Sequence, residues 1–293
     1  MVNLGKVITA MLTPLKGDMS VDYARAEELA VRLLANGSDG LVLHGTTGES
    51  PTLTHEEEYE LYRVVKKTVG NKGSVIAGTG SNSTDTTIHS TREAEKIGCD
   101  AALLVVPYYN RPPQEGLYQH FKAVADKTGL PLIIYNIPGR TGVNMLPDTI
   151  ARAAQIKNYV GVKEAAGSAD QVSEIRAKTP KDFIIWSGDD SLTLPFLSVG
   201  AEGVISVASH LVGKEISDMV KAYFSGDVKK AGEIHFKLLP LFKVLFITSN
   251  PIMVKAAMEM TGFPVGKPRL PLIEANEKEK EAIKKVLKDL KII

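Results

Sequence analysis

The chain has 293 residues, of which 44% are hydrophobic and 24% are charged, a balance typical of a folded globular protein. Its 35 Lys and Arg residues nearly balance its 34 Asp and Glu residues, so the formal charge of +1 gives no electrostatic basis for binding nucleic acid or an anionic membrane. The single cysteine, Cys99, excludes an intrachain disulfide, and no apolar stretch approaches the ~20 residues of a membrane-spanning helix. Without a signal-peptide pattern at its start, the chain is expected to be cytoplasmic, with small molecules as its partners.

Short β-rich runs alternate with helical patterns along most of the chain. The stretch 21–36 has an apolar stripe at helical spacing. Later helices are predicted to begin after Thr54, with Glu57 completing a capping box, and after Ser168, with Gln171 in the same role. The eight predicted strands are 6–12, 40–45, 74–80, 101–107, 131–138, 159–165, 183–189 and 203–209.

Eight strand-then-helix units predict a closed parallel (β/α)8 TIM barrel, because right-handed crossovers place every helix outside the ring of strands. The alternative, a doubly wound open sheet, lacks its GxGxxG fingerprint after the first strand. Beyond residue 226 the pattern is helical, over 227–247, 250–260 and from about 276 onward. We therefore divide the chain into a catalytic barrel, 1–226, and a C-terminal helical domain, 227–293.

A lysine stands within the predicted sixth strand, in the run YVGVKEAAG. Side chains alternate along a strand, so Gly161 and Lys163 share one face, toward the mouth of the barrel. Val160 and Val162 share the other face and are expected to pack under the helices. Burying an ammonium is costly, so such a lysine pairs with a carboxylate such as Glu164, binds a substrate anion, or acts as a nucleophile. The last role requires a neutral amine, which burial favours by lowering the pKa.

Further candidates follow the predicted strands at their carboxyl ends, where barrels place their active sites. Tyr135 is either a core aromatic or a group that passes protons beside the lysine. Thr46 and Thr47, in GTTGES, could hold a carboxylate, although such loops are also ordinary turns. Arg140, in PGRTG, could grip a second carboxylate through two hydrogen bonds or be an exposed surface side chain.

Metal chemistry finds no support in the sequence. The six histidines show no short ligand spacing, so no metal is expected. His44 is interpreted as a hydrogen-bonded filler beside the GTTGES loop. The acidic pair Asp189 and Asp190 is interpreted as a loop and helix cap.

Several segments together resemble the pyruvate-dependent class I aldolases of the N-acetylneuraminate lyase superfamily, and within it the dihydrodipicolinate synthase family. The resemblance covers nearly the whole chain, and the order of its motifs is far more specific than any one of them. These motifs are TPLKGD, GTTGESPTL, VVPYYNRPPQEGLYQHF, YNIPGRTGVN, GVKEA, SGDD and GVISV.

This resemblance implies a Schiff-base-forming lyase of diaminopimelate and lysine biosynthesis. Lys163 would form an imine with pyruvate, and the derived enamine would attack L-aspartate-4-semialdehyde, with no cofactor. Protons would pass along Thr47, Tyr135 and Tyr109, the last from a neighbouring subunit of a homotetramer built of two tight dimers. The implied substrate-binding residues are Thr46, Thr47, Arg140, Gly188 and Ile205.

Some members of this family are inhibited by lysine in a cleft at the dimer interface. The residues that resemble that cleft are Ser50, His55, Asn82 and Tyr108. Glu58 stands where inhibited members tend to carry histidine, and Thr86 where they carry glutamate. Because an acid that could bind the effector's amine is lost, we expect weak or absent feedback by lysine.

Two other kinds of function stay open at this point. N-acetylneuraminate lyases and sugar-acid or hydroxy-oxoglutarate aldolases share the lysine and the tyrosine, but Arg140 and the first threonine of GTTGES favour the synthase family. A non-catalytic barrel that senses a keto acid is the second alternative. Such a sensor has no need of both an imine-forming lysine and a complete hydroxyl relay.

Overall fold

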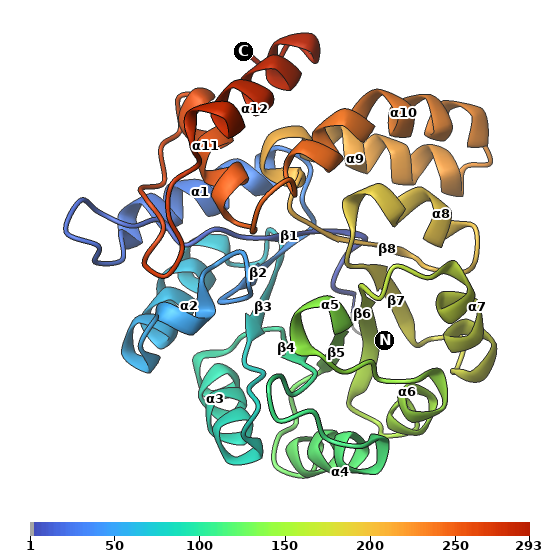
Figure 1. The fold of residues 1–293 in the computed structure, drawn as a ribbon. Coiled ribbons are helices and arrows are strands. Elements are labelled where there is room, and N and C mark those ends of the chain that lie inside the picture. The colour runs from blue at the N-terminus through green and yellow to red at the C-terminus, as the bar shows by residue number, and fades with distance from the viewer. Residues whose placement is uncertain (1–2) are drawn as a thin grey trace.

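A ring of eight parallel strands forms the centre of the structure, a computed structural model that describes residues 3–293 (Figure 1). Each strand pairs with the next in chain order, and β8 pairs with β1 to close the barrel. The predicted fold is confirmed, and each of the eight predicted runs contains one strand. The strands are β1 (Val7–Ala10), β2 (Gly40–Leu43), β3 (Ser74–Gly78), β4 (Ala101–Val105), β5 (Leu132–Asn136), β6 (Tyr159–Glu164), β7 (Ile184–Ser187) and β8 (Gly203–Ser206).

Helices surround this ring and cover its outer face, except the short α5, which lies at the carboxyl end of the strands (Figure 1). They are α1 (Tyr23–Ala35), α2 (His55–Val69), α3 (Thr84–Ile97), α4 (Gln114–Ala125), α5 (Pro138–Thr141), α6 (Pro147–Ala153), α7 (Ala169–Lys178), α8 (Thr193–Leu197) and α9 (Ser209–Phe224). The capping box of Thr54 and Glu57 is present at the start of α2. At α7, Ser168 caps Gln171 N as expected, but the Gln171 side chain instead hydrogen-bonds Asn144 and Glu164.

The barrel separates an inner from an outer core. Inside the ring, side chains such as Ile133, Tyr135 and Trp186 form one cluster, while Val162 belongs to the larger cluster between strands and helices. Val160 departs from the expectation that it shares the outward face of Val162, because it packs against the inner cluster. The cause is a shift in register: Leu132 pairs with Tyr159 and Ile133 with Gly161, which leaves Val160 as an extra residue and moves it to the other face.

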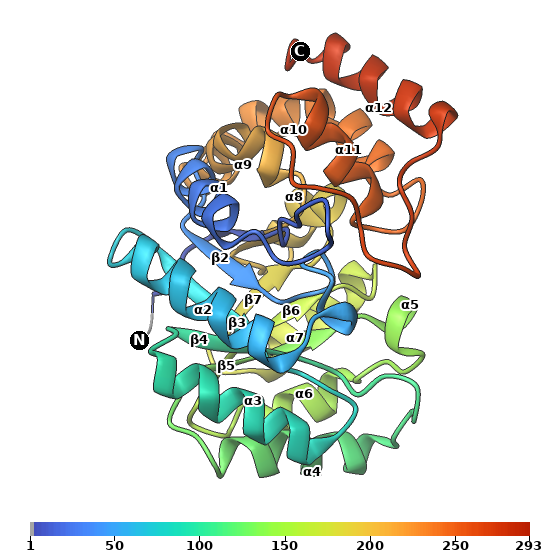
Figure 2. The same ribbon diagram turned by 90° about the vertical axis from the view of Figure 1, so that its left-hand side faces the viewer.

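Three more helices follow the barrel, α10 (Val228–Val244), α11 (Ile252–Met260) and α12 (Glu277–Asp289). They lie together on one side of the ring, with α10 packed on α9 (Figure 2). The helical C-terminal part is thus present, while the exact division of the chain at residue 226 stays a prediction. None of the helices within residues 3–293 combines the length and apolarity needed to cross a membrane.

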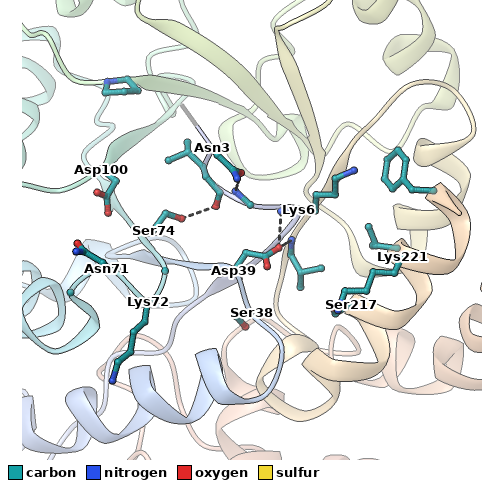
Figure 3. A pocket seen from close by; sticks show the side chains of 18 residues that line it. Asn3, Lys6, Ser38, Asp39, Asn71, Lys72, Ser74, Asp100, Ser217 and Lys221 are labelled. Atoms are coloured by element: carbon teal, nitrogen blue, oxygen red, sulfur yellow. Dashed lines mark hydrogen bonds between the residues drawn. The ribbon is translucent and has the colours of Figure 1, made fainter. Parts of the chain in front are cut away.

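The amino-terminal end of the barrel holds a hollow of about 900 Å³ (Figure 3). Its polar groups fasten the first strand: Asp39 Oδ2 accepts hydrogen bonds from Lys6 N at 2.8 Å and Val7 N at 2.9 Å, and Ser74 Oγ donates to Leu4 O at 2.7 Å. The candidate site residues lie elsewhere, at the opposite end of the strands.

Candidate active site

A second hollow, of about 420 Å³, lies at the carboxyl end of the strands. It is lined by residues that follow four strands, among them Thr46 after β2, Ser81 after β3, Tyr108 after β4 and Arg140 after β5, together with Tyr135 at the end of β5. The structure thereby brings together side chains that are far apart in the sequence. Their position agrees with the end at which barrels of this type place active sites.

Lys163 lies on β6 between Tyr135 of β5 and Trp186 of β7, and its side chain is only 6% exposed. Its Nζ lies 4.1 Å from the centre of the Tyr135 ring. Burial lowers the pKa of the Lys163 amine to about 7; the charge of Asp190 acts against this shift, and that of Arg140 adds to it. The neutral, nucleophilic form of the Lys163 amine is therefore accessible near pH 7.

Gly188 gives the Lys163 side chain its room. A Cβ at residue 188 would lie 3.2 Å from Lys163 Cε and 2.7 Å from Ala165 Cβ. Gly188 N donates a hydrogen bond to Glu164 O at 2.8 Å, which fixes the glycine against β6. A larger residue would press on the lysine stem, so this position shapes the site through its lack of a side chain.

Asp190 is a buried carboxylate near the same end of the barrel. It accepts hydrogen bonds from the Ser206 hydroxyl, from Val207 N at 3.1 Å and from Ala208 N at 3.0 Å. These bonds hold the turn between β8 and α9, but they do not cap α9, whose N-cap Ala208 has no side-chain cap; the cap interpretation holds for Asp189. Asp189 in turn accepts from Ser191 N at 2.8 Å. Burial raises the pKa of the Asp190 carboxyl, and its hydrogen bonds act in the opposite direction.

Tyr135 is buried beside the lysine amine. Burial raises the pKa of its phenol to about 12, while the charge of Arg140 and a hydrogen bond with Thr46 act in the opposite direction. The phenol is therefore protonated at neutral pH. When the amine has added to a carbonyl carbon, a protonated phenol beside it can donate its proton to the hydroxyl on that carbon. The hydroxyl then leaves as water.

Thr47, which follows Thr46 in the GTTGES loop, is buried and does not line the hollow. Its Oγ1 accepts a hydrogen bond of 2.9 Å from Nδ2 of Asn250, which precedes α11. The loop is also held by Thr13, whose hydroxyl donates to Gly48 O at 2.7 Å. Sequence reasoning missed Asn250, because no local pattern links two residues that lie 203 positions apart.

The remaining predicted binding residues lie around this centre. Arg140 is exposed on the short helix α5, at the rim of the hollow. Ile205 is buried in the inner barrel cluster and pairs with Ile8 across β8 and β1. These positions leave Arg140 accessible to a solute and Ile205 as part of the barrel interior.

Tyr109 does not line the hollow of its own chain. Its side chain is 90% exposed and its φ of 73° is unusual for a residue other than glycine. The neighbouring Asn110 Nδ2 donates to Asn82 O at 2.9 Å, which ties the loop down beside this tyrosine. A large, exposed aromatic side chain on a fastened loop is well placed to contact another molecule.

The residues of the resembled lysine cleft mostly share the hollow with Thr46 and Tyr135. Ser50, His55, Thr86 and Tyr108 line it, whereas Asn82 does not. Glu58 is buried and accepts hydrogen bonds from the Tyr62 hydroxyl at 2.8 Å and from His55 Nδ1 at 3.0 Å. Its carboxylate is therefore already engaged within the chain.

The His44 side chain lines the hollow and hydrogen-bonds the backbone at the end of β3. Its Nδ1 donates to Gly78 O at 2.9 Å and lies 3.4 Å from Glu58 Oε1. This agrees with its interpretation as a hydrogen-bonded filler. Within residues 3–293, no three His, Cys, Asp or Glu side chains gather into a cluster that could hold a metal ion.

A buried lysine with a lowered pKa, beside a protonated tyrosine at the carboxyl mouth of a (β/α)8 barrel, defines a Schiff-base-forming aldolase of class I. Comparison with known proteins narrows this class. The model of the "Dihydrodipicolinate synthetase family" matches residues 3–290, so the chain belongs to that family.

Similar proteins share the full length of the chain. Proteins named 4-hydroxy-tetrahydrodipicolinate synthase from Desulforamulus reducens and Acaryochloris marina are 55% and 56% identical, over 100% of this chain and 99% and 100% of theirs. A crystal structure of the synthase from Cyanidioschyzon merolae with lysine bound is 47% identical, has a TM-score of 0.98 and covers 99% of both chains. The synthase structure from Thermotoga maritima is 44% identical, with a TM-score of 0.96, over 98% of this chain and 99% of that one.

The lowered pKa of Lys163 predicts how its amine reacts with pH. Acetylation with acetic anhydride, followed by peptide mass mapping, should give a rate for Lys163 that levels off above a midpoint near pH 7. An ordinary lysine, with a pKa of about 10.4, would keep gaining reactivity above pH 9. Exposed Lys214, mapped in the same digest, controls for the reagent. A Lys163 rate that still rises steeply above pH 9 would contradict the assigned pKa.

Proposed function

We propose that Lys163 carries the reaction of this family, the condensation of pyruvate with L-aspartate-4-semialdehyde in diaminopimelate and lysine biosynthesis. The supporting observation is the buried amine of Lys163, with a pKa of about 7 and 4.1 Å from the Tyr135 ring. The amine attacks the keto carbon of pyruvate, and the resulting carbinolamine loses water to form an imine. Loss of a methyl proton then gives an enamine, which attacks the aldehyde carbon and restores the imine. The amino group of the semialdehyde part then attacks the imine carbon, which closes the ring and releases the Lys163 amine.

Three hydroxyls move the protons of this sequence. We infer that Tyr135 protonates the departing hydroxyl of the carbinolamine, since burial keeps its phenol protonated at neutral pH. The sequence-based expectation has Thr47 and the Tyr109 of a neighbouring subunit link Tyr135 to solvent. The hydrogen bond of Tyr135 with Thr46 instead supports Thr46 as the threonine of this link. No group in this relay is a histidine, and the imine itself draws electrons from the adjacent carbon, so no cofactor is needed.

The binding residues divide between the two substrates. Thr46 and Thr47 would hold the pyruvate carboxylate with their hydroxyls and loop amides, beside the lysine that forms the imine. Arg140 would bind the carboxylate of the aldehyde, because it is exposed at the rim of the same hollow. The backbones of Gly188 and Ile205 would complete the pocket wall. We also propose the cytoplasm as the place of this reaction.

The choice of aldehyde tests this function against its sister aldolases. The chain should consume L-aspartate-4-semialdehyde with pyruvate, and Lys163→Ala should abolish this turnover while the protein stays folded by circular dichroism.

Arg140→Ala should raise the KM for the semialdehyde about 10- to 100-fold, as expected for a lost hydrogen bond to a charged group, and leave the KM for pyruvate almost unchanged. Pyruvate release from N-acetylneuraminate or a sugar acid without semialdehyde consumption would instead assign a sister aldolase. No reaction with any of them would favour the sensor.

We propose a homotetramer of two tight dimers, in which each site borrows Tyr109 from its neighbour. The support is the exposed, fastened position of this tyrosine outside its own hollow. A related synthase, 44% identical, is described as the first monomeric variant of that enzyme.

Mixed oligomers test the borrowed tyrosine directly. Subunits with Lys163→Ala and subunits with Tyr109→Phe, combined and allowed to exchange, should recover more turnover than either parent. The reason is that one site in a mixed dimer regains both groups. Native mass spectrometry verifies the exchange, and unmixed parents at equal concentration are the control. Absence of recovery after verified exchange would place Tyr109 outside the site.

Lysine feedback is expected to be weak or absent. Glu58 is held by Tyr62 and His55, and Thr86 offers no carboxylate for the effector's amine. Turnover should therefore be unchanged at submillimolar lysine, while Thr86→Glu, which restores a carboxylate at the cleft, should increase the sensitivity. Strong inhibition of the unmodified chain at these concentrations would refute this expectation. The test matters because a related synthase has been crystallised with lysine bound.

A further inference from the structure

We propose that Gln171 is a positioning residue for Arg140, and that through it the helix after β6 contributes to selectivity for the aldehyde substrate. This inference rests on the proposed function, in which Arg140 binds the carboxylate of that aldehyde. Arg140 lies on α5, in the loop that leaves β5, whereas Gln171 lies on α7, which follows the strand of Lys163. Gln171 thus belongs to the element next to the imine and reaches the loop of the second binding group.

The contact between the two elements is a pair of side-chain amides. Asn144 Nδ2, near the end of the loop that carries Arg140, donates to Gln171 Oε1 at 2.8 Å. In return, Gln171 Nε2 donates to Asn144 Oδ1 at 3.2 Å. Each amide has a donor and an acceptor, so the two antiparallel bonds fix both the separation and the orientation of the groups. A side chain without an amide at position 171 cannot hold Asn144 in this way.

The amide pair is anchored on Glu164, the residue that follows Lys163 on β6. Its buried carboxylate accepts hydrogen bonds from three nitrogens: Ala166 N at 2.7 Å, Asn136 Nδ2 at 3.0 Å and Gln171 Nε2 at 3.2 Å. Asn136 follows Tyr135 and pairs with Glu164 across β5 and β6. Because successive strand residues point to opposite faces, the anchor lies directly behind the two residues of the reaction centre.

The far end of the Arg140 loop is fastened to this anchor. Asn136 Nδ2 donates to Asn144 Oδ1 at 2.7 Å, and Asn136 Oδ1 accepts from Met145 N at 3.0 Å. One asparagine therefore closes the loop, while Gln171 holds the Asn144 amide from its other side. The Asn144 side chain is fixed between the end of β5 and the start of α7.

The turn that carries Arg140 is compact and follows its base. The buried hydroxyl of Thr141 is shared between Ile137 O, at 3.1 Å, and Val143 O, at 2.9 Å. Gly142 N donates to Pro138 O at 2.9 Å. Arg140 itself is exposed, so its place relative to Lys163 comes from the backbone of this turn. Fixing Asn144 therefore fixes the reach of the Arg140 guanidinium over the hollow.

Other contacts keep the loop folded without Gln171. From α4, Gln114 Nε2 donates to Asn144 O at 2.8 Å, and Gln114 Oε1 accepts from Leu146 N at 3.0 Å. These bonds engage the backbone of the loop and leave the Asn144 side chain to Asn136 and Gln171. At the start of α7, Ser168 still caps the helix. Removal of the Gln171 amide is thus expected to loosen the position of the loop and not to unfold it.

The test is a double-mutant cycle of Gln171→Met with Arg140→Ala. Methionine keeps the length and the helical preference of glutamine but has no amide. We expect Gln171→Met to raise the KM for L-aspartate-4-semialdehyde about fivefold, as for the net loss of one hydrogen bond, with the KM for pyruvate within about twofold of the unmodified value. In the Arg140→Ala background the same substitution should raise the KM no further, because the group it positions is gone. Asn144→Ala, which removes the amide pair from the loop side, should act in the same direction.

Glu174→Met is the matched control, since Glu174 lies on the same helix and is exposed. It should leave both KM values unchanged. Hydrogen exchange of residues 137–146, followed by mass spectrometry, reports on the loop without turnover. Exchange there should be about fivefold faster in Gln171→Met and unchanged in Glu174→Met, because a loosened loop opens more often.

Three kinetic results would overturn the positioning role: an unchanged KM for the semialdehyde in Gln171→Met, equal rises in both KM values, or a further rise in the Arg140→Ala background. Asn144→Ala decides the question in the same way if Gln171→Met does not fold. If the unmodified chain consumes no semialdehyde, the proposed function fails. Hydrogen exchange then decides alone, and unchanged exchange of residues 137–146 in Gln171→Met overturns the role, whereas faster exchange confined to them upholds it.

Discussion

Burial of the Lys163 amine is the constraint on which the rest of the site depends. A lysine inside a strand of the ring loses its water, and this loss outweighs the favourable charge of Asp190, so its pKa falls to about 7. The same enclosure keeps the Tyr135 phenol protonated. One physical cause therefore prepares a neutral nucleophile and a proton donor side by side. Gly188 contributes by leaving space along the lysine stem.

The C-terminal helical part takes a direct share in this arrangement. Its residues reach the GTTGES loop at several points, from the buried pair of Lys255 and Glu49 to the hydrogen bond of Asn250 with Thr47. The barrel supplies Lys163 and Tyr135 on its strands, whereas the GTTGES loop beside them is held by side chains of the C-terminal helical part. The GTTGES loop is thus held in place by contacts between the barrel and the helices that follow it.

Local patterns in the sequence were sufficient for the barrel and for the place of Lys163. The eight strands follow from short apolar runs between helical stretches. The alternation of side chains along β6 correctly predicted that Lys163 faces the inside of the barrel. Features that depend on partners far along the chain escaped this reasoning. The extra residue Val160 appears only when β6 is aligned with β5, and Gln171 prefers Asn144 and Glu164 to its own helix end. The contact of Asn250 with Thr47 was missed for the same reason, and no local pattern indicates that Tyr109 is exposed and lies outside the hollow of its own chain.

The most direct test of this account is the mass of the intact chain after reduction with borohydride in the presence of pyruvate, followed by peptide mapping. The account predicts one reduced pyruvate adduct per chain, located on Lys163 and absent from the Lys163→Ala variant. An adduct on another lysine, or none under conditions where the chain turns over, would contradict the central role of the buried amine.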